Sequence, residues 1–207
     1  MLKRRFVLTA LSLFALGCVA LPMKASASSL ETEASAFVES LADQAMQALA
    51  NEDITRTERV ARFRDLFNAQ FAVKGIGKFV LGRYWKKASA AEQTEYLKLF
   101  EDLMVVSYVD RFTDYAGESL TIEKTVAPSA KKITVYTKIL KPKSAKSYAV
   151  NWRVGKGSKG FKVVDVVVEG TSMSTTLRSD FGSIIRQKGG KIAGLIDALK
   201  KKTASLQ

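Results

Sequence analysis

The sequence contains no histidine and a single cysteine, Cys18, among its 207 residues. Without imidazole the chain cannot build a Ser-His-Asp triad, a Cys-His pair, or a zinc or haem site that depends on histidine. A single cysteine also cannot form a disulfide framework within the chain. We therefore expect no catalytic residues, no metal site and no cofactor, and we do not expect an enzyme.

The first 27 residues have the pattern of a cleaved export signal. A basic start at Lys3 to Arg5 is followed by an almost wholly apolar stretch from Phe6 to Leu21. This stretch is short for a membrane span, and Ala25-Ser26-Ala27 supplies small residues at the spacing that signal peptidase reads. We expect cleavage after Ala27.

Two domain assignments follow from this cleavage: a signal peptide over 1–27 and one domain over 28–207. No later apolar run approaches the ~18 residues of a membrane helix, so we expect a soluble product in the periplasm. Lipid attachment at Cys18 is the alternative, because Ala15-Leu16-Gly17-Cys18 loosely resembles a lipid-attachment box.

The charge is strongly positive and unevenly distributed. The chain carries a net charge of +13, and removal of 1–27 takes away four cations and no acid, which leaves +9. Residues 28–118 hold 11 basic and 15 acidic groups, residues 119–168 hold 11 and 2, and the last 39 residues hold 7 and 3. The basic middle is either a solvated face or a surface for anionic partners such as lipid headgroups. It lacks the aromatic pattern of a base-stacking platform, so we expect no nucleic-acid partner.

The first half of the domain is patterned for helices. Ser28-x-x-Glu31, Thr55-x-x-Glu58 and Ser89-x-x-Glu92 each predict the start of a helix. The third helix is expected to be the longest, at about 25 residues, ending near Gly117. Residues 71–87 are also expected to be helical, with interruptions at glycines.

After Gly117 the apolar period changes from about 3.6 to 2, which predicts strands. We expect one from Leu120 that ends before Pro128, and others over 133–139, 148–154 and 161–168. The last is apolar on both faces except at Asp165, which predicts a central strand. Two helices should follow, near 173–187 and 191–202. The expected fold is α+β: N-terminal helices and two C-terminal helices packed on a twisted antiparallel sheet of about four strands.

Two sequence features are typical of enzymes, but a structural role explains each of them better. Gly155 to Gly160 matches the dinucleotide pattern G-x-G-x-x-G, but a strand follows where that motif needs a helix, so these glycines predict a hairpin turn. Asp165 is a lone acid in a valine-rich strand, either a buried base with a raised pKa or the partner of a nearby Arg or Lys. We prefer the pair, because no nucleophile or second acid stands at a fixed spacing from it.

Several segments together resemble the MlaC family, also called the toluene-tolerance family. They occur in the family's order over nearly the whole domain: Phe79-Val80-Leu81-Gly82-Arg83-Tyr84-Trp85-Lys86, Glu92-Gln93, Phe100-Glu101-Asp102-Leu103, Tyr115-Ala116-Gly117-Glu118, Asp165 to Gly170, Arg178-Ser179-Asp180-Phe181, Lys188-Gly189-Gly190 and Leu195 to Leu199. Met173 to Leu177 is more polar than the corresponding family segment, which weakens the expectation that this stretch contacts lipid.

The resemblance implies a monomeric periplasmic phospholipid carrier. Such a carrier holds acyl chains in an apolar cavity between helices and sheet. It shuttles phospholipid between an inner-membrane ABC transporter complex and an outer-membrane lipoprotein–porin complex, which maintains outer-membrane lipid asymmetry. A hopanoid-like cargo, a periplasmic adaptor that binds only proteins, and a carboxylate-based hydrolase are the alternatives.

Two sets of candidate residues follow. The candidates for the lipid cavity are Phe79, Phe100, Leu103, Met104, Tyr108, Phe112, Val135, Ile139, Val150 and Trp152. The candidates for docking to membranes or partner complexes are Lys138, Lys141, Lys143 and Lys146.

Overall fold

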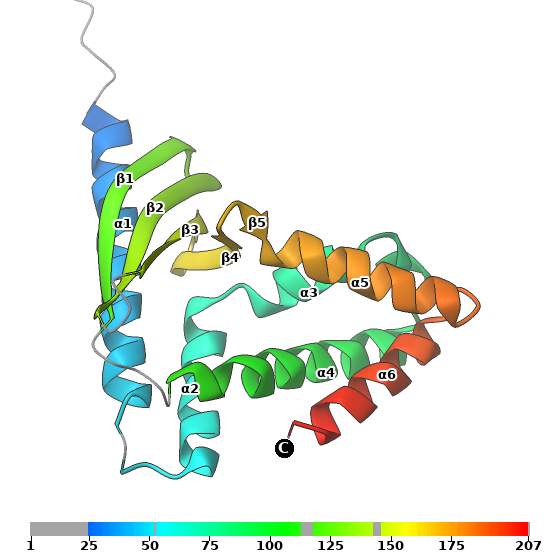
Figure 1. Ribbon diagram of the computed structural model, residues 1–207. Coiled ribbons are helices and arrows are strands. Elements are labelled where there is room, and N and C mark those ends of the chain that lie inside the picture. The colour runs from blue at the N-terminus through cyan, green and yellow to red at the C-terminus, as the bar shows by residue number, and fades with distance from the viewer. Residues whose placement is uncertain (1–24, 52, 113–117, 143–145, 207) are drawn as a thin grey trace, which may run out of the picture.

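The computed structural model describes residues 25–51, 53–112, 118–142 and 146–206, which form helices around a single antiparallel sheet (Figure 1). The helical elements in these ranges are α1 (Ala25–Leu49), α2 (Arg56–Gln70), α3 (Val73–Leu81), η1 (Gly82–Lys87), α4 (Ala90–Tyr108), η2 (Val109–Phe112), α5 (Met173–Gln187) and α6 (Ile192–Ala204). The strands are β1 (Ser119–Ser129), β2 (Lys132–Lys141), β3 (Lys146–Gly157), β4 (Gly160–Val168) and β5 (Thr171–Ser172).

Local capping fixes two of the three predicted helix starts. The Thr55 hydroxyl accepts a hydrogen bond from the Glu58 backbone N–H at 3.2 Å. Ser89 and Glu92 form a complete capping box at the start of α4, because each side chain accepts from the other residue's backbone N–H. The predicted start at Ser28 is wrong: α1 already begins at Ala25, where small residues with good helix propensity extend it.

The predicted length of α4 is also wrong. It has 19 residues and ends at Tyr108, whereas α1 has 25 residues and is longer. After Tyr108 the chain tightens into the 3-10 turn η2, as helix ends commonly do. The predicted end near Gly117 lies outside the described residues. By contrast, the predicted break within 71–87 is confirmed at Gly82, whose φ of 59° ends α3.

The sheet has the strand order β1-β2-β3-β4-β5, and each strand runs antiparallel to its neighbours. The predicted hairpin turn is confirmed, because Gly157 pairs with Gly160. β1 continues through Pro128, which was predicted to lie beyond its end; an edge strand tolerates a residue without a backbone N–H. The fifth strand, β5, has only two residues.

β4 was predicted to be a central strand, and it has a neighbour on both sides only at its C-terminal end. β4 pairs along its length with β3, but on its other side β5 pairs only with Val167 and Val168. The chain after α2 covers part of this second edge, where the Ala72 N–H donates to the Val163 carbonyl at 2.9 Å. Val163, Asp165 and Val167 are buried, whereas Val164 and Val168 are 39% and 37% exposed, so β4 is not covered on both faces despite its apolar sequence.

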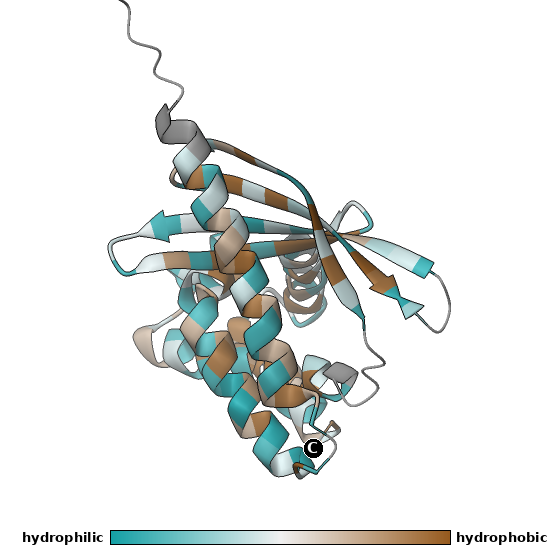
Figure 2. Ribbon diagram, turned by 90° about the vertical axis from the view of Figure 1, so that its left-hand side faces the viewer, coloured by the Kyte–Doolittle hydropathy of each residue, from teal (hydrophilic) through white to brown (hydrophobic). Residues whose placement is uncertain are grey.

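The described residues form two separate cores. In the first, Ala34 and Val38 of α1 pack on Ile133, Val135 and Val154 of the sheet, and Figure 2 shows α1 crossing the strands. The second core lies among the helices from α2 through α6, and its buried side chains include Tyr96, Phe100, Phe181, Ile185 and Leu195. Figure 1 shows this helical part extending away from the sheet. The α+β class is confirmed.

None of the helices in the described ranges is both long enough and apolar enough to cross a bilayer.

Candidate functional site

A large cavity lies between α1, α2 and the sheet. Its volume is about 790 Å³, and most of its lining is apolar. α1 supplies small and flexible side chains, α2 supplies aromatic rings, and the sheet supplies one wall. The lining residues are Glu39, Leu41, Ala42, Asp43, Ala45, Met46, Phe63, Leu66, Phe67, Phe71, Glu118, Ser119, Leu120, Ile139, Lys141 and Trp152.

A smaller cavity of about 240 Å³ lies where α2, α3, α4 and α5 meet β3 and β4. Its lining residues are Phe63, Phe67, Phe71, Ile76, Phe100, Met104, Tyr108, Trp152, Asp165, Val166, Met173, Ser174 and Leu177. Both cavities are lined by the same four aromatic residues, Phe63, Phe67, Phe71 and Trp152. The two spaces therefore adjoin across this aromatic wall.

Three of the four wall residues form a stripe along α2. The rings of Phe63 and Phe67 stack with centroids 6.1 Å apart, and those of Phe67 and Phe71 are 4.9 Å apart. The spacing of four residues places them on one helix face. Phe71 is the C-cap of α2 and is held against the sheet by a bridge to Val163. The sequence predicted a helix starting at Thr55, but none of these three phenylalanines was among the cavity candidates.

Trp152 completes the wall from the sheet side. It pairs with Val135 across β2 and β3, and its indole Nε1–H donates to the Thr137 hydroxyl at 3.3 Å. The buried Thr137 hydroxyl in turn donates to the Val150 carbonyl. The polar group of the indole is thus satisfied within the sheet, and its apolar surface remains available to both cavities.

The charged lining residues of the larger cavity are Glu39, Asp43, Glu118 and Lys141. The first two lie on α1, and the other two lie at neighbouring ends of β1 and β2. The Lys141 Nζ is 3.9 Å from the Glu118 carboxylate. The larger cavity thus combines an apolar wall with charged groups of both signs, as binding an amphipathic molecule requires.

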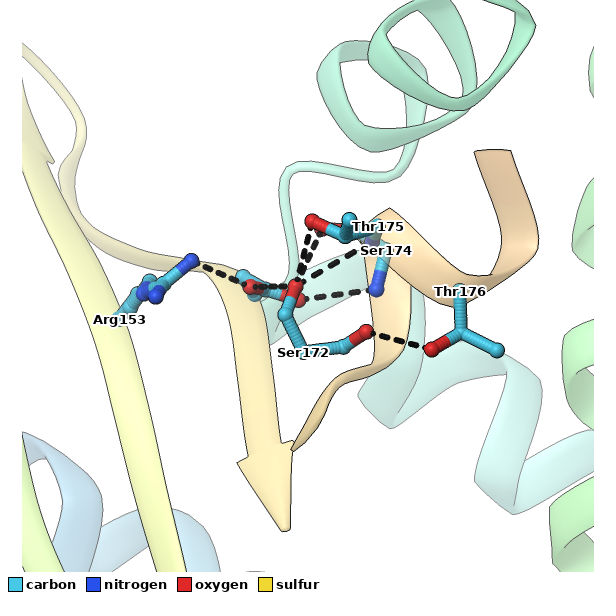
Figure 3. A network of polar contacts seen from close by, with 6 residues as sticks. Arg153, Ser172, Ser174, Thr175 and Thr176 are labelled. Atoms are coloured by element: carbon cyan, nitrogen blue, oxygen red, sulfur yellow. Dashed lines mark hydrogen bonds and ion pairs between the residues drawn. The ribbon is translucent and has the colours of Figure 1, made fainter. Parts of the chain in front are cut away.

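Asp165 is buried beside the smaller cavity, with 6% of its surface exposed. Its carboxylate accepts hydrogen bonds from the Arg153 guanidinium at 2.9 Å, the Ser172 hydroxyl at 2.6 Å and the Ser174 backbone N–H at 3.0 Å. Figure 3 shows Arg153 on one side of this network and Ser172, Ser174 and Thr175 on the other. The predicted pairing of Asp165 with a basic residue is confirmed, and the network ties β4 to β3 and to the start of α5.

The structure brings five of the ten cavity candidates to a cavity. Phe100, Met104 and Tyr108 line the smaller one, Ile139 lines the larger one, and Trp152 lines both. Three candidates are buried without lining either: Leu103, Val135 and Val150.

The remaining two cavity candidates are Phe79 and Phe112. Phe79 of α3 lines neither cavity and is 47% exposed. A lipid contact for Phe79 stays a prediction. The side chain of Phe112 lies outside the described residues.

The polar segment from Met173 to Leu177 contributes more than its sequence indicates, because Met173, Ser174 and Leu177 line the smaller cavity. Hydroxyl groups in and next to this segment are used locally: Ser172, the residue before it, caps α5 by accepting from the Thr175 N–H, and the Thr176 hydroxyl donates to the Ser172 carbonyl. Such polar residues start the helix while their apolar neighbours line the cavity.

Nearby carboxylates balance the charge of two of the docking candidates. Lys138 is ion-paired with Glu123 at 2.5 Å, and Lys141 lies near Glu118. Lys146 is exposed, and Lys143 lies outside the described residues. A docking role for these lysines stays a prediction.

Within the described ranges, no group of three or more His, Cys, Asp or Glu side chains is placed to hold a metal ion. What the geometry offers is a pair of adjoining apolar cavities with an aromatic wall between them.

Comparison with known proteins agrees with this geometry. The family model for the MlaC protein matches residues 39–201. The intermembrane phospholipid transport system binding protein MlaC of Haemophilus influenzae is 26% identical over 152 residues, which cover 70% of this chain and 69% of that protein. The fold is similar to that of a phospholipid-binding protein from Ralstonia solanacearum, solved in complex with a phospholipid. The two share 21% identity with a TM-score of 0.74, over 84% of this chain and 98% of the other. Because the family match spans most of the sequence, this chain belongs to the MlaC family.

Proposed function

We propose that this protein is a periplasmic carrier that binds a phospholipid by its acyl chains and moves it between membranes. The observation that carries the proposal is the larger cavity, with its apolar lining from α1, α2 and the sheet. The phospholipid-binding and transport descriptions of its relatives support the same cargo.

The volume of the cavities suits acyl chains. A methylene group fills about as much space as a water molecule, roughly 30 Å³. The larger cavity, at about 790 Å³, therefore has room for about 26 such groups, which is more than one chain. The smaller cavity adds room for about eight. Together they have room for about 34 such groups, enough for the roughly 30 methylenes of a lipid with two chains.

The physical need for such a cavity follows from the hydrophobic effect. Each methylene removed from water contributes about 0.8 kcal/mol, so a lipid with about 30 methylenes essentially cannot cross an aqueous gap unaided. A dry apolar cavity makes the exchange between bilayer and protein nearly neutral. No proton transfer or covalent step is needed, so the carrier requires neither a cofactor nor a catalytic residue.

The cavities also bear on the alternatives. An adaptor that binds only proteins has no use for about 790 Å³ of apolar space. A hydrolase built on Asp165 lacks support because that carboxylate is already held by Arg153, Ser172 and Ser174. A hopanoid-like cargo would have to fit a rigid ring system across the aromatic wall, whereas flexible chains can follow the two adjoining spaces.

The biological route is part of the same proposal. The carrier would be a monomer that exchanges lipid with an inner-membrane ABC transporter complex and an outer-membrane lipoprotein–porin complex, so that outer-membrane lipid asymmetry is maintained. Export by a signal over 1–27 is expected to leave Ser28 as the first residue, within the first turn of α1. Amino-terminal sequencing of the exported protein tests this point.

The test of the cargo is direct. The protein is purified from the periplasm without detergent, and its mass is measured under native conditions before and after lipid extraction. We expect a bound species with the mass of a glycerophospholipid. Protein that carries no lipid and cannot be loaded from vesicles would overturn the proposal, and a hopanoid mass would change the cargo.

A further inference from the structure

A second feature lies outside the cavities, on the surface formed by α3, η1 and one residue of α5. We call it the α3 surface; it comprises Lys74, Lys78, Phe79, Arg83, Lys86, Lys87 and Arg178. All seven residues are exposed. The sequence from 66 to 91 contains five cations and no acid, so the positive charge of this surface is not balanced within its own segment.

Four of the six cations lie over aromatic rings. The Arg178 guanidinium lies 4.9 Å from the centre of the Phe79 ring and also donates to the Phe79 carbonyl at 2.9 Å. Lys78 lies over Trp85 at 5.7 Å. Phe79 is 47% exposed, the highest value among the large hydrophobic side chains that the structure describes. The surface therefore combines positive charge with an exposed aromatic ring.

A glycine at position 82 makes room for Arg178 beside the end of α3. Gly82 has a φ of 59°, and a Cβ atom there would lie 2.9 Å from the Arg178 guanidinium. Only glycine avoids both the backbone strain and the close contact. The turn at Gly82 thus lets Arg178 of α5 reach across the end of α3.

The cations of the α3 surface are not paired with carboxylates of the described residues. On the sheet, Lys138, Lys156 and Arg153 form ion pairs with acidic residues. None of the six α3-surface cations forms an ion pair with another described residue. This includes Arg178, although Asp180 lies only two residues away in the sequence.

Positive charges near the Tyr84 hydroxyl lower the pKa of that hydroxyl. The hydrogen bond from Arg83 is the largest cause lowering the pKa of Tyr84, and the charges of Arg186 and Lys87 lower it further.

The surface also borders the wall of the smaller cavity. Ile76 of α3 and Leu177 of α5 line that cavity. Phe79 lies one helical turn beyond Ile76, and Arg178 is the residue after Leu177. A partner bound to the α3 surface would therefore contact the elements that enclose the cavity.

We propose that the α3 surface docks the carrier on the headgroup region of an anionic phospholipid bilayer. Aromatic rings and basic side chains together favour this interface, because the ring enters the headgroup region while the cations meet lipid phosphates. The inference rests on the proposed function, since a lipid carrier must meet a source or acceptor of lipid. An acidic protein is the competing partner, and the experiment separates the two.

The experiment measures sedimentation of the full carrier with phosphatidylcholine vesicles that contain either no anionic lipid or one fifth phosphatidylglycerol. We expect binding to the anionic vesicles that weakens as salt is raised. The double variant Lys86→Gln/Lys87→Gln should bind them about 25-fold more weakly, or about fivefold for each cation. Phe79→Ala should weaken binding about fivefold, because about half of the ring is available to enter the interface.

The matched control is Lys201→Gln/Lys202→Gln, which removes the same charge from exposed positions on α6. It should bind nearly as well as the wild type. Equal losses in both double variants would overturn the inference, as would wild-type binding that does not depend on anionic lipid. Absence of binding to either kind of vesicle would overturn it as well and would leave an acidic protein as the partner to test.

Lipid content by native mass spectrometry separates this inference from the proposed function. If the carrier holds phospholipid but does not sediment with anionic vesicles, the result contradicts the docking inference alone. Carrier that binds vesicles but never holds phospholipid contradicts the proposed function.

Discussion

Filling the larger cavity from α1 should reduce the lipid that the protein retains. Ala45 lines this cavity and is half-buried, so Ala45→Trp places an indole in open space rather than in a packed core. The indole adds about nine non-hydrogen atoms, each displacing roughly one methylene worth about 0.8 kcal/mol. The lipid would lose about 7 kcal/mol of binding free energy in total. The nine displaced methylenes are about a third of the number for which the larger cavity has room.

Part of this loss in binding free energy can be recovered if chain ends move into the smaller cavity. If only one third of the loss remains, about 2.4 kcal/mol, retention is still weakened roughly 50-fold. The assay incubates loaded carrier with a fixed excess of vesicles and measures the lipid left per protein by native mass spectrometry. Urea denaturation should give a free energy of unfolding within about 1 kcal/mol of the wild type, because the site tolerates added volume.

The control for this prediction is Ala36→Trp, which places the same side chain on an exposed position of α1 that lines neither cavity. It should retain lipid like the wild type. The reasoning is refuted if Ala45→Trp folds normally and keeps as much lipid as Ala36→Trp.

Three further substitutions test the surrounding structure by urea denaturation. Asp165→Asn should lower the free energy of unfolding by about 2 kcal/mol, because its hydrogen bond from Arg153 is charge-assisted, while lipid retention persists; lost retention with unchanged stability would contradict a structural role. Ser89→Ala should cost about 1 kcal/mol by removing the capping box of α4, and an unchanged transition would contradict this. Val135→Trp should cost at least about 3 kcal/mol because Val135 is 0% exposed in the core beneath α1, and a stable variant that loses lipid would place it at the cavity instead.

Local chemistry made much of the fold predictable. The starts of α2 and α4 depend on Thr55 and Ser89, whose side chains act within a single turn. The hairpin at Gly157 and Gly160 depends on the same short range. The surroundings of β4 were not predictable in this way. Apolar patterning does not distinguish a strand neighbour from a helix, and Val164 and Val168 stay exposed although they are apolar.

The cavity was only partly predictable, because core and cavity residues share the same pattern. Leu103 and Met104 are adjacent apolar residues of α4, yet only Met104 lines a cavity. α1 contributes Ala42 and Ala45, whose small size helps leave space, and hydrophobic periodicity does not register missing volume. The stripe at Phe63 and its neighbours was present in the sequence, and its spacing of four was the available signal.

The most direct test of the central claim uses the fluorescence of Trp152, which lines both cavities. The chain contains two tryptophans, so Trp85→Phe leaves Trp152 as the only one. This variant is loaded with phospholipid carrying bromine atoms on its acyl chains, or with the same lipid without bromine, and loading is verified by native mass spectrometry. The account predicts strong quenching by the brominated lipid alone. Equal fluorescence from both fully loaded samples would show that the chains lie elsewhere and would contradict it.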